Sequence, residues 1–374
     1  MFAEIIICAL MALPSVEFVQ SRTFESSTID QYGNSFTVTG LSGLVWAGDN
    51  TWYGVMDNSS HIVSLEIDYQ MNGYISVELQ SGLLLSRYGD YEDIALGTDG
   101  SIILSDETTQ DLHAFHPETG DLIESYALHP IYQTRRSNLG CESFCSNGES
   151  VWIANEEALL GDGPTATPEN GTTVRITHGP LGVLQSATQV AYEVDQMPGP
   201  YIPITNDGQS GLVAILELPS GEVLCLERSL AFVDALLKSK IYLIDFSSAT
   251  DVQSFATLLG SEYDPCNKEL LYEGPRENME GLSIGPELDE DSYLLLGIVD
   301  DGDPISDNRI NAFIVHDVSV CSEDVNNDDV VGVADILELI EFWGSCNDCD
   351  ADINDDGVVD VLDILQVVAA WGPC

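Results

Sequence analysis

Basic side chains are scarce in this sequence. In 374 residues, 11 Lys and Arg stand against 63 Asp and Glu, which gives a formal net charge of −52. A surface of that sign repels phosphate backbones and anionic lipid, so we expect no nucleic-acid partner. It attracts divalent cations and keeps a protein soluble in salt-rich surroundings. Most of the acidic side chains are therefore expected to face solvent.

Long apolar runs are also lacking, and we predict no transmembrane segment. The run at residues 5–13 is too short to span a bilayer. It is similar to the apolar part of a secretory signal, although Glu4 stands where a basic residue is usual. We therefore assign residues 1–20 to a signal peptide. The alternative is that the run forms a buried first strand of the main domain.

Familiar catalytic patterns are missing as well. The sequence contains no G-x-S-x-G nucleophile elbow and no H-E-x-x-H zinc motif, and its six histidines show no metal-ligand spacing. Ser42 and Ser210 stand in G-x-S-G contexts, but both coincide with the repeat described below, which favours a structural role. A Ser-His-Asp hydrolase remains an alternative that no motif supports.

The nine cysteines fit an oxidising compartment, because setting aside Cys8 leaves an even number. Four of them frame the C-terminal segment: Cys321 and Cys346 are 25 residues apart, as are Cys349 and Cys374. This regularity predicts disulfides, with three possible connectivities. Together with the signal peptide, it predicts an extracellular or cell-surface location.

The C-terminal segment contains a tandem repeat of two 12-residue loops rich in side-chain oxygens. The candidate metal ligands are Asp324, Asn326, Asp328, Val330 (through its carbonyl) and Asp335 in the first loop, and Asp352, Asn354, Asp356, Val358 (through its carbonyl), Asp360 and Asp363 in the second. Several oxygens that converge from one short loop are what Ca²⁺ requires. The second loop has Gly357 at its sharp turn, whereas the first has Asp329 there and Gly332 in place of a ligand. We expect the first site to be the weaker one.

Each loop is followed by apolar residues at helical spacing. The two sets are Ile336, Leu337, Ile340 and Trp343, and Ile364, Leu365, Val368 and Trp371. Two such helices can pack face to face. Because the segment is acidic and has no Lys or Arg, bound cation should be needed for it to fold.

This segment resembles the type I dockerin family, whose paired EF-hand-like units bind two calcium ions and dock onto cohesin modules. The resemblance covers residues 319–374. It departs from the family at loop positions 10 and 11, where a polar recognition pair is replaced by Val333-Ala334 and Val361-Leu362. The partner it implies is therefore a cohesin-like module or another cell-surface anchor.

The preceding segment, residues 21–318, is predicted to be mainly β, because short runs of apolar and aromatic residues alternate with turn dipeptides. A degenerate repeat opens with Ser42-Gly43-Leu44, Glu92-Asp93-Ile94, Glu142-Ser143-Phe144, Ser210-Gly211-Leu212 and Glu280-Gly281-Leu282. Strand units of about 40–50 residues are typical of β-propeller blades. The length of the segment predicts six or seven blades.

Acids recur at the openings and at the ends of the second strands of these units. In a propeller they would form a ring of carboxylates at one mouth of the central channel. The alternative is that they are strand-end residues that face solvent, as most acids in this chain are expected to do.

These blade openings, together with Leu218–Ser229, resemble the phytase-like propellers described as having esterase-like activity. The resemblance implies that calcium is held by Glu92, Glu142, Glu227 and Glu280, and that Arg228 contacts a small anionic or ester substrate. It predicts a secreted, calcium-dependent hydrolase of phosphate or other esters, tethered by its dockerin-like tail. Two alternatives remain open. One is a non-catalytic binding or adhesion propeller, and the other is a component of a polysaccharide-degrading assembly.

Overall fold

The structure is a computed structural model that describes residues 14–148, 150–198, 208–231, 236–274, 277–289, 292–300, 308–316, 323–326, 330–346, 349, 351–354 and 357–373. The chain divides into two compact units. The larger one comprises Pro14–Asp317 and the smaller one contains Val318–Cys374. In the described part of the chain no helix is both long enough and apolar enough to cross a membrane.

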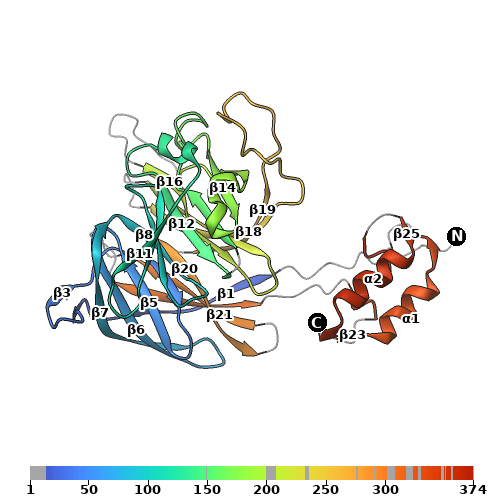
Figure 1. The fold of residues 1–374 in the computed structure, drawn as a ribbon, viewed down its shortest axis with the longest axis horizontal. Coiled ribbons are helices and arrows are strands. Elements are labelled where there is room, and N and C mark those ends of the chain that lie inside the picture. The colour runs from blue at the N-terminus through green and yellow to red at the C-terminus, as the bar shows by residue number, and fades with distance from the viewer. Residues whose placement is uncertain are drawn as a thin grey trace. The chain divides into compact units, whose positions relative to one another are not determined.

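The larger unit is a five-bladed β-propeller (Figure 1). From the channel outward, blade 1 comprises β4 (Leu41–Trp46), β5 (Thr51–Met56), β6 (Ser59–Tyr69) and β7 (Ile75–Gly89), and blade 2 comprises β8 (Tyr91–Leu96), β9 (Ile102–Asp106), β10 (Asp111–Phe115) and β11 (Leu122–Ala127). Blade 3 comprises β12 (Cys141–Ser146), β13 (Val151–Asn155), β14 (Thr172–Gly179) and β15 (Thr188–Val194). Blade 4 comprises β16 (Gly208–Glu217), β17 (Val223–Ala231), β18 (Leu236–Asp245) and β19 (Asn267–Gly274). The first strands β4, β8, β12 and β16 each contact the first strand of the next blade, and β20 contacts β4, so they close a ring.

Blade 5 joins the two ends of the propeller. Its strands are β20 (Met279–Asp289), β21 (Ser292–Val299), β22 (Arg309–His316) and β1 (Ser15–Thr23), and β1 pairs with β22 in antiparallel register. Residues 15–20, which we assigned to the signal peptide, therefore belong to the propeller, and the domain begins before residue 21. Residues 1–13, the remainder of the predicted signal peptide, lie outside the described residues.

The prediction of a mainly β propeller is confirmed, but the prediction of six or seven blades is wrong. The five repeats found in the sequence correspond to five blades, and each blade uses more chain than assumed. Strand β7 alone has 15 residues. Further chain goes into the connection between β18 and β19, and into a hairpin of β2 (Ser27–Ile29) and β3 (Ser35–Thr37) before blade 1.

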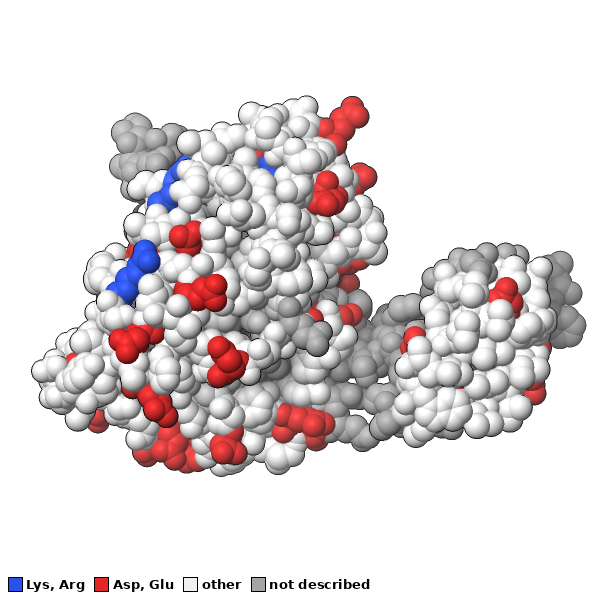
Figure 2. Space-filling model, viewed as in Figure 1, with Lys and Arg blue, Asp and Glu red and all other residues white. Residues whose placement is uncertain are grey.

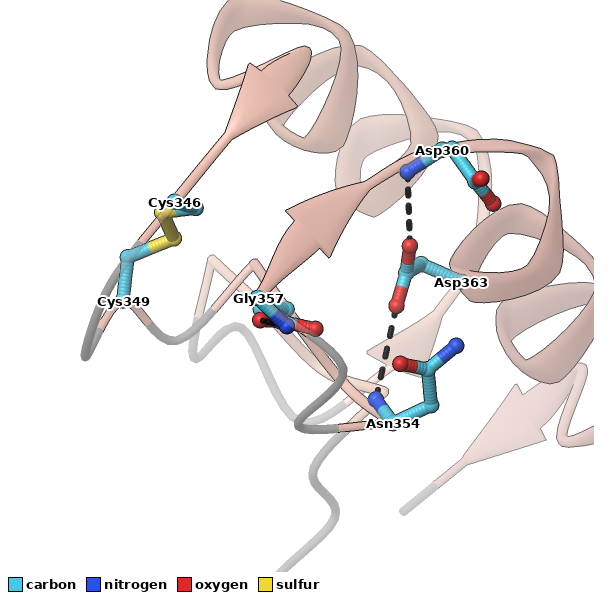
Figure 3. Close-up of a disulfide and its surroundings, with 7 residues drawn as sticks. Cys346, Cys349, Asn354, Gly357, Asp360 and Asp363 are labelled. Carbon is cyan, nitrogen blue, oxygen red and sulfur yellow. Dashed lines mark hydrogen bonds between the residues drawn. A yellow bond between two sulfur atoms is a disulfide. The ribbon is translucent and has the colours of Figure 1, made fainter.

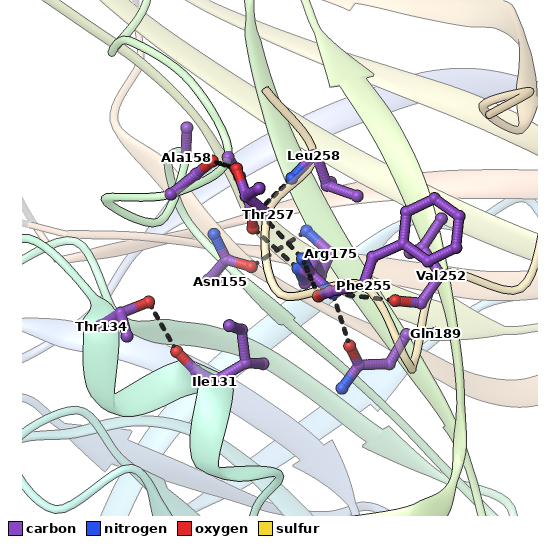
Figure 4. Close-up of polar contacts among 12 residues, drawn as sticks. Ile131, Thr134, Asn155, Ala158, Arg175, Gln189, Val252, Phe255, Thr257 and Leu258 are labelled. Carbon is purple, nitrogen blue, oxygen red and sulfur yellow. Dashed lines mark hydrogen bonds and ion pairs between the residues drawn. The ribbon is translucent and has the colours of Figure 1, made fainter. Parts of the chain in front are cut away.

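The long connection between β18 and β19 is anchored by a buried arginine on β14 (Figure 4). The Arg175 guanidinium donates two hydrogen bonds to Asp162, at 2.7 and 2.9 Å, and further ones to the carbonyls of Val252 (3.1 Å) and Phe255 (3.0 Å). Because Arg175 is fully buried, losing Asp162 would leave an unpaired charge in the core.

The smaller unit contains two helices, α1 (Val333–Glu341) and α2 (Val361–Ala369), each preceded by a two-residue strand. β23 (Val330–Val331) pairs with β26 (Gly372–Pro373), which follows α2, whereas β25 (Val358–Val359) pairs with β24 (Gly344–Ser345), which follows α1. Each repeat thus supplies the strand partner of the other, and the two halves fold as one unit.

The helix faces in this unit differ from the prediction. The core is formed by Val331, Leu339, Ala351, Val359 and Val367, with Ile336 and Ile364 packed against it. Leu337, Ile340, Trp343, Leu365, Val368 and Trp371 are instead exposed, and the two tryptophans keep 54% and 52% of their surface. The inward positions are spaced i, i+3, and the sequence pattern missed their second members, Leu339 and Val367.

One disulfide, Cys346–Cys349, is present in this unit. Of the three connectivities left open by the sequence, the structure has the one that contains Cys346–Cys349; Cys321 and Cys374 lie outside the described residues. In the described part of the propeller, Cys141, Cys145, Cys225 and Cys266 are not disulfide-bonded, and three of them are buried. Their even number was therefore no sign of pairing, because buried cysteine packs as a small apolar residue.

Candidate functional site

The first layer of the site consists of side chains at the start of the inner strands. Glu92, Glu142 and Glu280 lie at β-bulges, where the register of pairing with the second strand skips one or more residues. Ser42 occupies the same position in blade 1. In blade 4 the irregularity falls at Val213, beyond the predicted opening at Ser210, so this blade adds no acid to the layer. A bulge can re-aim a side chain, and here it sets the three carboxylates apart from the regular alternation of their strands.

A second layer comes from the residues at the ends of the second strands. In four blades the backbone N–H at this position donates to the chain just before the inner strand. These pairs are Asp57 with Gly40, Glu107 with Asp90, Glu156 with Gly140, and Asp300 with Asn278, at 2.7–2.9 Å. In blade 4 the equivalent residue, counted from the bulge, is Arg228, which pairs with Gly211. Two layers of carboxylates and one arginine therefore line the same mouth of the channel.

Glu227, predicted to hold metal, lies elsewhere. Successive side chains of a strand point to opposite faces, so Arg228 faces the channel and Glu227 faces blade 3. There its carboxylate accepts hydrogen bonds from Tyr192 Oη (2.6 Å) and the backbone N–H of Asp195 (2.9 Å), and it pairs with Lys268. Glu227 is thus separated from Glu92, Glu142 and Glu280.

Three carboxylates stand close enough together to hold a metal ion. One oxygen each from Asp90, Glu92 and Glu107 lies within 4.8 Å of the other two. Glu107 is held in place by Gly140, whose backbone N–H donates to Oε1 at 2.6 Å. A side chain at residue 140 would begin 2.8 Å from Glu107 Cγ, so glycine permits this close approach. Converging carboxylate oxygens suit Ca²⁺, Mg²⁺ or Mn²⁺.

Arg228 joins the other carboxylates of the two layers. Its guanidinium pairs with Glu156 at 2.7 Å and with Glu280, and it donates to Asn278 Oδ1 at 3.2 Å. Asn278 in turn donates to Glu280 (3.1 Å) and Asp300 (3.2 Å). These contacts hold the carboxylates of blades 3 and 5 around the Arg228 guanidinium.

The electrostatics separate these two groups. Burial, followed by the charges of Glu107 and Glu280, holds the pKa of Glu92 well above its usual range. Burial likewise raises the pKa of Glu107 to about 7, despite the hydrogen bond from Gly140. Burial raises the pKa of Glu280 to about 8 although Arg228 opposes the shift. Burial is the main cause of all three shifts, and a divalent cation at Asp90, Glu92 and Glu107 would favour the ionised carboxylates instead.

The two C-terminal loops share one geometry, which Figure 3 draws for the second loop. The fully buried Asp363 carboxylate accepts the backbone N–H of Asn354 (3.4 Å) and of Asp360 (2.7 Å). Asp335 does the same with Asn326 (3.2 Å) and Gly332 (2.6 Å). In each loop the last carboxylate therefore draws both sides of the loop together.

The predicted ligands of the loops are only partly described. Asp324, Asp352, Val330 and Val358 lie within the described residues, and the first two are buried. Asp328 and Asp356 lie outside them. The Cys346–Cys349 disulfide precedes the second loop (Figure 3). The backbone N–H of Cys346 donates to the Gly357 carbonyl at 3.0 Å.

Residues 37–302 match the model of the family described as "Phytase-like: Esterase-like activity of phytase". The chain belongs to this phytase-like family. The match spans the inner strands of all five blades, including every carboxylate of the two layers. It ends before the C-terminal unit.

Other comparisons add no argument about the phytase-like propeller. The solved structures it is similar to include hydrazine synthase from Kuenenia stuttgartiensis (8% identity, 70% of this chain and 76% of that one, TM-score 0.34). They also include virginiamycin B lyase from Staphylococcus aureus (9%, 80% and 99%, 0.32) and a mannose phosphorylase from Leishmania mexicana (10%, 80% and 89%, 0.34). A search of curated proteins found no match.

Sequence reasoning missed Asp90, and it named Glu107, Glu156 and Asp300 only as strand-end acids of the possible ring, each paired with a neighbour and none chosen as a metal ligand. The strand-end acids were noticed, but which of two neighbours faces the channel depends on the bulge register. Once the structure gives the position of each bulge, a count of residues from it selects Glu107 over Asp106 and Arg228 over Glu227.

Proposed function

We propose that the propeller is a calcium-dependent hydrolase of phosphate or other esters. The observation that carries this proposal is the group of buried carboxylates at the channel mouth, with Asp90, Glu92 and Glu107 within metal-binding distance of one another. Membership of the phytase-like family supports the same chemistry. Without a cation, so many carboxylates would repel a phosphate ester.

Bound calcium would supply a Lewis acid that neutralises the ester oxygens and polarises the scissile bond. The residues of the chain have separate tasks. Asp90, Glu92 and Glu107 hold the cation. Glu280, whose pKa is raised to about 8 mainly by burial, retains a proton at neutral pH and can give it to a leaving oxygen. Arg228 holds Glu280 and Glu156 in position, and any contact with the substrate anion would compete with these pairs.

The C-terminal unit is proposed to be a dockerin-like, calcium-folded anchor that tethers a secreted enzyme to a cohesin-like or cell-surface partner. Its paired loops, with Asp335 and Asp363 buried at the same position, support calcium binding. Its exposed Leu337, Trp343 and Trp371 support a docking role, since a small unit that exposes so much apolar surface is typical of a protein that binds a partner.

The test measures hydrolysis of p-nitrophenyl phosphate and p-nitrophenyl acetate by the full chain, first stripped of metal and then titrated with Ca²⁺. We expect activity that requires Ca²⁺ and is lost in Glu92→Gln and Glu280→Gln. Glu17→Gln is the matched control, because Glu17 is an exposed acid on β1. Equal hydrolysis of both substrates in excess chelator would refute the proposed mechanism. Tight binding without turnover would instead favour a non-catalytic propeller.

A further inference from the structure

The outer half of blade 2 contains a chain of three polar side chains on three neighbouring strands. Ser125 Oγ on β11 lies 2.8 Å from Nδ1 of His113 on β10. His113 Nε2 lies 3.2 Å from Oδ2 of Asp106 on β9. The register explains the alignment, since His113 stands opposite both Ser125 and Leu104, and Asp106 follows Leu104 by two residues. All three side chains therefore lie on one face of the blade.

The three side chains differ in burial, and their hydrogen bonds determine which nitrogen of His113 carries the hydrogen. His113 and Asp106 are buried (0% and 1% exposed), whereas Ser125 is exposed. A carboxylate only accepts hydrogen bonds, so Nε2 carries the imidazole hydrogen. Nδ1 is then free to accept the hydroxyl hydrogen of Ser125.

Two other blades show what is special about this one. Ser150 Oγ lies 3.2 Å from His178 Nε2 in blade 3, and Ser292 Oγ lies 2.8 Å from His316 Nδ1 in blade 5. Within the described residues, neither of these rings is hydrogen-bonded to a carboxylate. A Ser-His contact thus recurs in the propeller, and blade 2 adds the carboxylate that completes a nucleophile, base and orienting acid.

We propose that Ser125, His113 and Asp106 form a second hydrolytic site, which cleaves uncharged carboxylic esters without metal. The acidic surface would repel anionic esters, and Leu122 and Ile123 on the same strand expose apolar surface to an acyl group. β11 is the outermost strand of its sheet, and the outward N–H groups of an edge strand are suited to donate to an oxyanion.

The reaction balances with water alone. Ser125 Oγ attacks the ester carbonyl as its proton moves to His113 Nδ1, and the tetrahedral adduct expels the alkoxide, which takes that proton. Water then gives a proton to the same nitrogen and attacks the acyl-serine. Its collapse releases the acid and returns the proton to Ser125. Asp106 acts as a positioning residue that stabilises the charged imidazole.

The test uses the full chain in excess chelator with a fluorophosphonate probe, followed by peptide mass spectrometry and an assay with p-nitrophenyl butyrate. We expect the label on Ser125, and a loss of metal-free hydrolysis of about 100-fold or more in Ser125→Ala. Ser150→Ala and Ser292→Ala should keep both. Asp106→Asn tests positioning through the labelling rate. If that variant misfolds, Thr109→Val gives a milder probe, because it removes one partner of the same ring.

Absence of label on Ser125 in folded protein, or unchanged metal-free hydrolysis in Ser125→Ala, would overturn the proposal. The two sites are distinguishable. Glu92→Gln should leave fluorophosphonate labelling intact, and Ser125→Ala should leave calcium-dependent phosphate hydrolysis intact.

Discussion

The channel mouth and the C-terminal loops gather the same ligand type, carboxylate oxygen, by opposite means. In the channel the carboxylates come from different blades and are positioned by strands with large apolar cores on either side. In the C-terminal unit each set comes from one 12-residue loop and is supported by a small core. We therefore expect the channel to keep its charges together even when they repel, and the C-terminal unit to need a cation in order to fold.

The surface charge deepens this contrast. The face in Figure 2 shows acidic side chains spread over both units and few basic ones. The channel has Arg228 among its carboxylates, whereas the C-terminal unit has no Lys or Arg. Four experiments test this difference between the two units.

The largest effect is expected from chelation. Removing calcium should unfold α1 and α2, because the unit has no Lys or Arg to balance the loop carboxylates, while the strands of the propeller persist. Hydrogen–deuterium exchange with mass spectrometry on the full chain measures both units at once. Peptides from residues 333–341 and 361–369 should exchange completely in chelator, and peptides from the inner strands should not. Protection of both helices in chelator would show that the two units do not differ in this way.

A large effect is also expected at the channel, where the structure and the sequence disagree. Glu107→Gln should lower calcium-dependent hydrolysis by about 100-fold, because it removes one of three converging ligands. Glu227→Gln should change it by less than about threefold, since that side chain faces blade 3 and Gln can still accept from Tyr192. Calcium titration by calorimetry checks that the first variant loses binding. The reverse ranking would restore the assignment made from the sequence.

An intermediate effect is expected from pH. The pKa values of Glu107 and Glu280 in the folded chain, raised by burial to about 7 and about 8, exceed those in the unfolded chain. Folding therefore favours the protonated forms. In chelator, the stability contributed by these groups is complete below the ordinary carboxyl pKa of 4.5 and is lost as pH rises through 7 to 8.

Thermal unfolding of the propeller measures this dependence. Its midpoint in chelator should fall between pH 5 and pH 8, and added calcium should reduce the fall because it binds the ionised carboxylates. A midpoint that rises over this range would contradict the raised pKa values of Glu107 and Glu280.

The smallest effect separates the two loops. Asp360 Oδ1 accepts the backbone N–H of Leu362 at 2.7 Å and caps α2, whereas Gly332, its counterpart in the first loop, has no side chain to do so. Asp360→Gly should lower the stability of α2 by a few tenths of a kcal/mol and weaken the second calcium site a few-fold. The converse Gly332→Asp is the matched control and should strengthen the first. Equal affinities in the wild type would contradict the expected order.

The sequence predicted well what depends on neighbouring residues. The two C-terminal helices and the strand–turn rhythm are local features, and the repeat openings at Glu92, Glu142 and Glu280 mark three of the five inner strands. Blade number failed because it was inferred from average blade length rather than from the repeats themselves. Long strands such as β7 and the connection between β18 and β19 take up the remaining chain.

Other features required the three-dimensional register. Whether Glu227 or Arg228 faces the channel depends on a bulge at Val213, and no local pattern marks it. Similarly, Asp106, His113 and Ser125 are aligned only by the pairing of three strands. The buried faces of the two helices were predicted wrongly for a simpler reason. Trp343 and Trp371 are apolar but exposed, and a hydrophobic pattern alone does not separate a core from a docking face.

The position of β1 in the last blade delays closure of the propeller until the whole domain has been synthesised. It pairs with β22, so the first strand of the propeller to leave the ribosome must wait for the last one. At about 5–20 residues per second, roughly 300 residues take on the order of 15–60 s. Through that interval the four earlier blades can form in sequence, but the ring stays open and β1 has no partner. The newborn chain is therefore most exposed to mispairing and to proteases at its two ends, and closure comes as a single late event.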